Sequence, residues 1–212
     1  HGARFVFIST DSVFDGRRGH YSEEDQPAPV NEYARTKLAA EEAVRKWLSD
    51  ALIVRTNFYG WNFKQKSSLG EWMLERLVRR EQLPAFANVR FNPLLVNHLG
   101  KIILNLVARG AKGVFHVAAR NECSKHEFAL MIAEIFGLDT GEVRPASVDD
   151  WGFNAQRPKN TTLAVDRISR FLRREMPSVE EGLRSFKQLL DIGYVAALKE
   201  SEAKGLKALS AR

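Results

Sequence analysis

The chain has 212 residues, of which 44% are hydrophobic and 27% are charged, and its formal net charge is +6. These values are typical of one soluble domain, or of one domain with a small second lobe, and they exclude intrinsic disorder. No apolar run approaches the ~20 residues of a transmembrane helix, and no signal-peptide pattern is present. The single cysteine, Cys123, excludes an internal disulfide and fits a reducing compartment, so we expect a cytoplasmic protein. Because the long apolar run is lacking, we expect no contact with a membrane.

The first 60 residues indicate the order strand, helix, strand. Residues 4–8 are a short apolar run that ends in polar residues, which is typical of a buried parallel strand. After a loop rich in glycine, aspartate and proline, Asn31 can cap a helix over about residues 32–48, and residues 51–54 form a second apolar strand. This order predicts a βαβ unit. The apolar side of its helix, which we expect to be buried, carries Leu38, Val44, Trp47 and Leu48.

Helices and strands continue to alternate in the rest of the chain. Two further helices start with capping boxes, at Ser124 and at Ser178, because a glutamate follows each serine three residues later. Residues 195–212 are rich in alanine, lysine and glutamate and indicate an exposed helix or a frayed tail. The other predicted elements are helices over about residues 67–82 and 94–108 and a strand over 114–117. The first of these helices is expected to bury Leu69, Trp72, Met73 and Leu77.

Together the elements predict an α/β fold. We interpret it as the C-terminal portion of a doubly wound, parallel, Rossmann-like sheet with a smaller α/β substrate-binding lobe. The predicted sheet domain comprises residues 1–60 and 94–118, the lobe comprises residues 61–93 and 119–193, and residues 194–212 form the tail.

Tyr33 and Lys37 are the first candidates for chemistry. Of the four tyrosines only Tyr33 has a lysine four residues later, which puts both side chains on one face of the predicted helix. An ammonium near a phenol favours the phenolate, so such a pair can transfer protons. Ser9 and Thr10 end the preceding strand, where parallel sheets bind ligands, and a hydroxyl there can hold a substrate carbonyl. From this pattern alone, Tyr33 and Lys37 could also be two ordinary polar residues on an exposed helix face. Ser9 and Thr10 could likewise be a simple cap at the end of the strand.

Longer stretches of the sequence carry a family pattern. They are STDSVFDG (9–16), YSEEDQP (21–27), YARTKLAAE (33–41), RTNFYG (55–60), GVFHV (113–117), SKHEFA (124–129) and RPKNT (157–161). Together these stretches resemble the extended short-chain dehydrogenase/reductases, and among them the dTDP-4-dehydrorhamnose reductase branch. The resemblance extends over about residues 4–190.

This resemblance implies that NADPH or NADH reduces a 4-keto, nucleotide-linked deoxysugar. It implies that Tyr33 gives the proton, that Thr10, with Ser9, holds the carbonyl oxygen, and that Lys37 holds the nicotinamide ribose. The catalytic residues would then be Thr10, Tyr33 and Lys37. The implied cofactor-binding residues are Ser9, Tyr33, Lys37, Arg55, Thr56 and Asn57. The implied substrate-binding residues are Ser9, Thr10, Asp11, Ser12, Phe58, Asn62 and Arg157.

Departures from the family pattern leave alternatives open. Ser12 stands where sugar-nucleotide dehydratases have a second acid, which argues against dehydratase chemistry, whereas epimerases share the Ser/Tyr/Lys set. Ser12 and Phe58 also replace a tyrosine and a tryptophan that are usual in the rhamnose-forming reductases, so the sugar is not defined. A second class of function is a non-catalytic, NADP-binding regulatory subunit, such as the β subunit of methionine adenosyltransferase.

Charged residues suggest the kind of partner. Arg157 precedes Pro158 in a loop rich in asparagine and threonine, where its guanidinium can bind a diphosphate or form a structural ion pair. No basic run is interleaved with aromatic residues, so we expect no nucleic-acid binding. The histidines lack metal-ligand spacing, so we expect no metal site. A homodimer is a possible assembly.

The glycines lack a pattern that this kind of fold uses. None of the 14 glycines forms G-x-G-x-x-G or G-x-x-G-x-x-G, the loop that seats the cofactor pyrophosphate on a helix N-terminus. In the resembling family that loop precedes the strand that is residues 4–8 here. Since the chain begins at His1, we expect a fragment that lacks about 90 residues, or three βα units of ~30 residues. The first strand would then be an exposed edge, and the choice between NADP and NAD is not defined.

Overall fold

The computed structural model describes residues 3–62 and 66–200. A three-stranded sheet is formed by β1 (Val6–Ile8), β2 (Leu52–Arg55) and β7 (Gly113–His116), in the order β1-β2-β7. Both pairings are parallel. The helix between the first two strands therefore returns the chain to the same end of the sheet, which confirms the predicted βαβ order.

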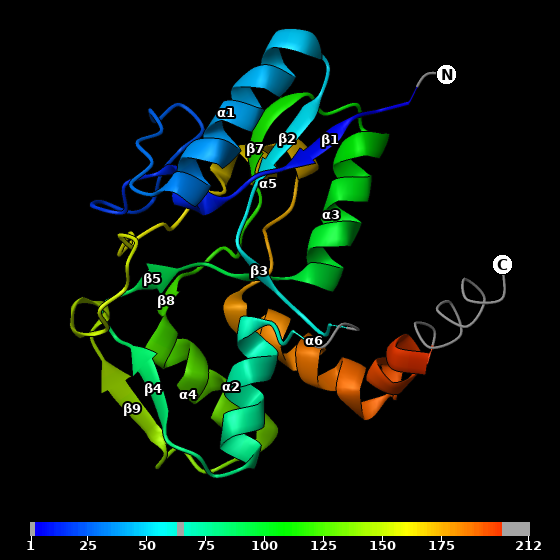
Figure 1. Ribbon diagram of the computed structural model, residues 1–212. Helices are drawn as coiled ribbons and strands as arrows, with labels where there is room; N and C mark the ends of the chain where they lie inside the picture. The colour runs from blue at the N-terminus through cyan, green and yellow to red at the C-terminus, as the bar shows by residue number, and fades with distance from the viewer. Residues whose placement is uncertain (1–2, 63–65, 201–212) are drawn as a thin grey trace, which may run out of the picture.

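Helices cover both faces of this sheet. Figure 1 shows α1 (Glu32–Trp47) and α3 (Val96–Ala108) on opposite sides of it. The short α5 (Asp166–Leu172) shares a hydrophobic cluster with α3 and with alternate residues of β2. The predicted lobe boundary put α5 outside the sheet domain, but its apolar side chains pack on the sheet.

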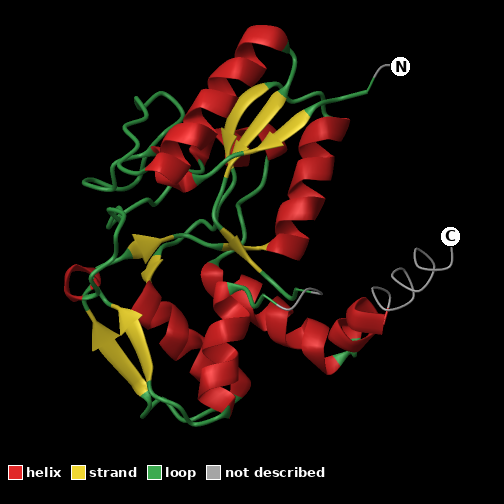
Figure 2. Cartoon of the chain, viewed as in Figure 1, coloured by secondary structure: helices red, strands yellow, loops and turns green. Residues whose placement is uncertain are grey.

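A second body lies beyond the sheet. There β4 (Leu83–Phe86) pairs in parallel with β9 (Val143–Ala146), beside α2 (Leu69–Val78), α4 (Lys125–Phe136) and α6 (Val179–Asp191). Figure 2 shows α2 and α4 beside the two strands, and α6 packs against α4. They enclose the larger hydrophobic cluster, which accounts for the predicted helical periodicities. Among the described residues, no helix combines the length and apolar character needed to cross a membrane.

Two short strand pairs connect the bodies. One pair is parallel and the other antiparallel. They are β3 (Phe58–Tyr59) with β6 (Leu94–Leu95), and β5 (Arg90–Phe91) with β8 (Cys123–Ser124). Residues 194–200 are helical, and residues 201–212 of the predicted tail lie outside the described residues.

The predicted helix caps are confirmed. The Asn31 side chain accepts a hydrogen bond from the backbone N–H of Ala34 at 3.0 Å, so α1 begins where the sequence predicts. Ser124 and Ser178 both form complete capping boxes. A further capping box at Ser68, which starts α2, was not predicted.

The predicted apolar side of α1 is wrong at its end. Trp47 is 76% exposed and Leu48 is 40% exposed, whereas Ala34 and Glu41 are fully buried. The helix packs through Ala34, the paired charge of Glu41, and the half-buried Leu38 and Val44, whereas the large side chains at its end face solvent. Trp72 on α2, predicted to be buried, is likewise 38% exposed.

The paired charge is Glu41, which lies between α1 and the sheet. Its carboxylate accepts hydrogen bonds from Arg55 Nε at 3.0 Å and from Arg55 Nη2 at 2.7 Å, and both side chains are almost completely buried. The Ser9 hydroxyl donates to the same carboxylate. One turn earlier, Lys37 Nζ donates to the carbonyl of Ile8 at 2.6 Å. These contacts fix α1 against the ends of β1 and β2.

We expect Glu41→Gln to lower the free energy of unfolding by about 3–5 kcal/mol, because it leaves the Arg55 guanidinium buried without a counter-charge. Urea denaturation measures this loss. The control is Glu32→Gln on the same helix, where the exposed Glu32–Arg35 pair should contribute less than about 1 kcal/mol. Equal losses for the two variants would contradict the role of the buried pair.

Candidate active site

The carboxyl end of β1 leads directly into a short 3-10 turn, η1 (Asp11–Val13). Thr10 is its N-cap: the hydroxyl accepts a hydrogen bond from the N–H of Ser12 at 3.2 Å and donates to Asp11 Oδ1 at 3.1 Å. This turn follows the strand end where ligands of parallel sheets bind, as the sequence predicts for Thr10 and Asp11.

The Asp11 carboxylate joins three segments of the chain. Its Oδ2 accepts hydrogen bonds from Asn57 Nδ2 at 2.9 Å and from Thr161 Oγ1 at 2.7 Å. Its Oδ1 accepts from the hydroxyls of Thr10 and Ser12, and the side chain is buried. All of these partners are donors, so the Asp11 carboxylate is held in a fixed orientation.

Tyr33 lies beside this carboxylate, at the edge of a cavity of about 290 Å³. It is in the first turn of α1 and 59% exposed, so its phenol is accessible to a ligand. The structure thus brings together five residues that the sequence singled out. They are Asp11, Ser12, Tyr33, Asn57 and Arg157, which all line this cavity.

Other predicted residues do not line the cavity, as far as the described residues show. Lys37 is half-buried one turn along α1, with Nζ 4.4 Å from the Phe7 ring centroid. Ser9 and Arg55 are both committed to Glu41, so their side chains hold the fold. Their proposed contacts with a ligand stay predictions.

Thr56, Phe58 and Asn62 follow β2 in the sequence. Thr56 is buried, and its hydroxyl has no hydrogen-bond partner in the described structure. Phe58 is 50% exposed on β3. Asn62 is half-buried and donates a hydrogen bond from its side chain to the carbonyl of Lys66 at 2.7 Å.

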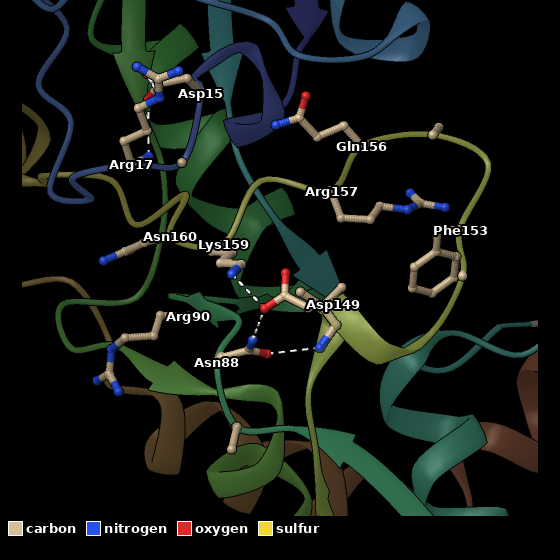
Figure 3. A pocket seen from close by; sticks show the side chains of 15 residues that line it. Asp15, Arg17, Asn88, Arg90, Asp149, Phe153, Gln156, Arg157, Lys159 and Asn160 are labelled. Atoms are coloured by element: carbon tan, nitrogen blue, oxygen red, sulfur yellow. Dashed lines mark hydrogen bonds and ion pairs between the residues drawn. The ribbon is translucent and has the colours of Figure 1, made fainter.

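Arg157 lies where the first cavity meets a second, of about 600 Å³, which Figure 3 shows from close by. Three other cations line the second cavity, and each is paired with a carboxylate. The pairs are Arg17–Asp15 at 3.6 Å, Arg90–Glu122 at 2.8 Å and Lys159–Asp149 at 2.6 Å.

Arg157 has no such carboxylate partner among residues 3–62 and 66–200, and its guanidinium carbon lies 5.0 Å from the Phe153 ring centroid. The described structure therefore shows no structural ion pair for Arg157. Its guanidinium, which is exposed, is available to an anionic ligand.

The loop that carries Arg157 is held by two close contacts. Asn31, the cap of α1, donates from Nδ2 to the carbonyl of Gln156 at 3.0 Å. Gly16, with φ +74°, packs so tightly that a Cβ there would lie 2.5 Å from Pro158 Cβ. The loop after β1 and the loop before α5 are therefore packed together beside Tyr33.

Sequence reasoning missed Lys125, which also lines the 290 Å³ cavity. It is the first residue of α4, and its Nζ lies 3.4 Å from the Phe91 ring centroid. Burial lowers the pKa of this ammonium to about 8, although the charge of Asp11 acts in the opposite direction. The predicted capping box at Ser124 located this position, but nothing in the sequence showed that it faces the cavity.

Comparisons with known proteins identify relatives that match most of the chain. The chain is 33% identical over 183 residues to the probable low-salt glycan biosynthesis reductase Agl14 of Haloferax volcanii. It is 36% identical over 173 residues to a dTDP-4-keto-6-deoxy-D-glucose reductase of Streptomyces niveus, and 30% identical over 175 residues to methionine adenosyltransferase 2 subunit beta of Danio rerio. These matches cover 84%, 77% and 79% of the chain, which spans 61%, 57% and 54% of the relatives' own lengths.

Solved structures show the same fold. The dTDP-4-dehydrorhamnose reductase of Bacillus anthracis in complex with NADP matches with a TM-score of 0.80 at 34% identity, over 87% of this chain and 65% of that one. A dTDP-4-dehydrorhamnose reductase of Clostridium acetobutylicum matches with a TM-score of 0.81 at 26% identity, over 90% of this chain and 67% of that one. The predicted α/β class with a parallel, Rossmann-like sheet is thereby confirmed.

A family model matches nearly the whole chain. It covers residues 1–191, including the βαβ unit, the cavity with Tyr33 and Asp11, and the body built on α2, α4 and α6. The chain therefore belongs to the family described as the RmlD substrate binding domain.

Proposed function

We propose that this chain is the substrate-binding and proton-donating part of a nicotinamide-dependent reductase that acts on a 4-keto, nucleotide-linked deoxysugar. The observation that carries the proposal is the shared cavity: a phenol, a fixed carboxylate and an unpaired guanidinium line one space of about 290 Å³. Such a set suits a ligand with a carbonyl at one end and phosphates at the other. The relatives named as reductases support this assignment.

In this proposal Tyr33 donates a proton to the substrate oxygen as it becomes an alkoxide. A bound nicotinamide dinucleotide supplies the hydride for the keto carbon. Thr10 does not line the cavity, and it would hold the carbonyl oxygen by exchanging its hydrogen bond to Asp11 for one to the substrate, while Asp11 and Ser12 position the sugar. The turn η1 fixes these three side chains relative to one another, because its hydrogen bonds leave Asp11 a single orientation.

The cofactor site fits the nicotinamide end of a dinucleotide. Lys37 uses one N–H on the carbonyl of Ile8, which leaves donors for ribose hydroxyls. The Thr56 hydroxyl, which has no hydrogen-bond partner in the described structure, follows β2 at the same carboxyl edge of the sheet as Ile8. The sequence contains no glycine-rich loop for the pyrophosphate. The choice between the cofactors NADP and NAD is supported by a relative: the reductase of Bacillus anthracis was solved in complex with NADP, which favours NADP here.

Arg157 is proposed to bind the diphosphate that links nucleoside and sugar. Its planar guanidinium matches phosphate oxygens bidentately, and the loop contacts of Asn31 and Gly16 hold it beside the sugar position. Assembly as a homodimer and location in the cytoplasm stay predictions.

A regulatory role is the second candidate, because relatives named methionine adenosyltransferase 2 subunit beta match 79% of the chain. A regulatory subunit would copurify with a larger synthetase and would not oxidise NADPH with any sugar nucleotide. An epimerase would interconvert sugar epimers without net consumption of NADPH. One screen of dTDP-4-keto sugars on the full-length protein separates all three functions.

We expect Tyr33→Phe to lower kcat in the full-length protein by about 10²–10⁴-fold, because the general acid is lost. The rate of NADPH oxidation at saturating concentrations of a dTDP-4-keto-6-deoxy sugar measures the effect. Since the Tyr33 side chain is 59% exposed, the melting temperature should stay unchanged. Unchanged turnover would refute Tyr33 as the proton donor.

Arg157→Ala is expected to raise KM for the sugar nucleotide and Kd for dTDP by about 10–100-fold, because a charge-assisted phosphate contact is removed. Calorimetry with dTDP measures the loss of affinity. Arg184→Ala on the exposed face of α6 is the control and should change neither constant.

The 212-residue chain by itself is expected to bind NADPH only in about the millimolar range, because it contains no glycine-rich loop for the pyrophosphate. It should also be inactive. Calorimetry of the chain tests this, and micromolar binding of NADPH would show that the three-stranded sheet of this chain is sufficient.

A further inference from the structure

Lys125 is a cation that the proposed mechanism does not use. It lines the 290 Å³ cavity together with Tyr33 and Arg157, and it also borders an apolar recess of about 240 Å³. The capping box of Ser124 and Glu127 fixes the first turn of α4 and therefore the start of this side chain.

The surroundings of Lys125 are unfavourable for a charge. It occupies the first position of α4, where the helix dipole disfavours a cation. Burial disfavours its charged form, and no carboxylate pairs with its ammonium within the described chain. Asp11 lies near enough to act on it electrostatically, but that carboxylate already accepts four hydrogen bonds. The Phe91 ring is its one close favourable contact, at 3.4 Å.

A lysine that only stabilised the fold would not be placed in this way. Its N–H donors face a cavity and make no hydrogen bond among the residues that the structure describes. An apolar residue could cover Phe91 equally well without the cost of burying a charge. The arrangement instead suits a cation that becomes paired when a ligand enters.

We propose that Lys125 binds the diphosphate of the nucleotide-linked substrate together with Arg157. This inference rests on the proposed function, because it takes the ligand of the cavity to be a sugar nucleotide. Each phosphate of the diphosphate carries a negative charge, so one ammonium and one guanidinium balance it. The Lys125 ammonium acts as a compact point charge beside the bidentate contact of Arg157.

The recess beyond Lys125 supports a phosphate at this point. It is lined by Trp72, Phe86, Trp151 and other apolar residues, and Lys125 is the one charged residue on its wall in the described structure. A ligand that passes Lys125 therefore leaves polar surroundings for apolar ones. The charged linker of a sugar nucleotide, and not a sugar hydroxyl, gives the half-buried ammonium the strongest compensation.

The test is calorimetry on the full-length protein at pH 7 with dTDP, and with thymidine as the phosphate-free probe. Lys125→Met, which keeps the length of the side chain, should raise Kd for dTDP about 10–100-fold and leave the affinity for thymidine unchanged. Lys125→Arg should retain most of the dTDP affinity. Lys101→Met, on the exposed face of α3, is the matched control and should have no effect.

A second measurement separates binding from folding. Lys125→Met should melt at the same temperature as the wild-type protein or higher, because it removes a cation from a helix N-terminus. A lower melting temperature with unchanged dTDP affinity would show a structural role and overturn the inference.

The remaining outcomes are equally decisive. Unchanged dTDP affinity with a higher KM for the sugar nucleotide would assign Lys125 to the sugar, and an equal loss for thymidine would assign it to the nucleoside, so either result overturns the inference. Failure of the wild-type protein to bind dTDP would do the same. If the wild-type protein binds dTDP through Lys125 but reduces no 4-keto sugar nucleotide, only the proposed reaction fails.

Discussion

The buried pair of Glu41 and Arg55 is the interaction on which the site geometry depends. It joins α1 to β2, and the Ser9 hydroxyl extends the contact to the end of β1. Tyr33 lies two turns before Glu41 on the same helix, so the distance between the phenol and the turn at Asp11 follows from this packing. Replacing one partner would weaken this packing and leave the other charge buried without a counter-charge.

The cavity is built from segments that are far apart in the sequence. The Asp11 carboxylate receives donors from Asn57 and Thr161, and no one of these segments could orient it alone. Much of the site therefore consists of groups that are fixed before a ligand arrives. Preorganisation of this kind reduces the ordering that binding must accomplish.

The sequence predicted the elements that local signals define. Asn31, Ser124 and Ser178 begin helices through hydrogen bonds to neighbouring residues, and such contacts can be predicted from spacing alone. The burial of Trp47 was predicted wrongly, because periodicity does not show that Glu41, six residues earlier on α1, has its buried partner Arg55 on β2.

Long-range contacts set the limit for the site as well. Tyr33 and Asp11 were found from motifs, whereas Lys125 was missed although its capping box was recognised. Its role depends on the antiparallel pairing of β5 with β8, which places the Phe91 ring next to its ammonium. The pairing of β4 with β9 was not predicted either, because it joins segments about 60 residues apart and local sequence signals do not specify such a contact.

Asn31 uses both ends of its amide at once. The oxygen caps the helix of Tyr33, and the nitrogen holds the carbonyl next to Arg157. A ligand bound to the Arg157 guanidinium would therefore contact a loop that is hydrogen-bonded to the N-cap of the helix that carries Tyr33. In the proposed reaction, affinity for the remote, non-reacting part of a ligand would in this way contribute to the alignment of the Tyr33 phenol, and a ligand truncated before the phosphates would lose that contribution.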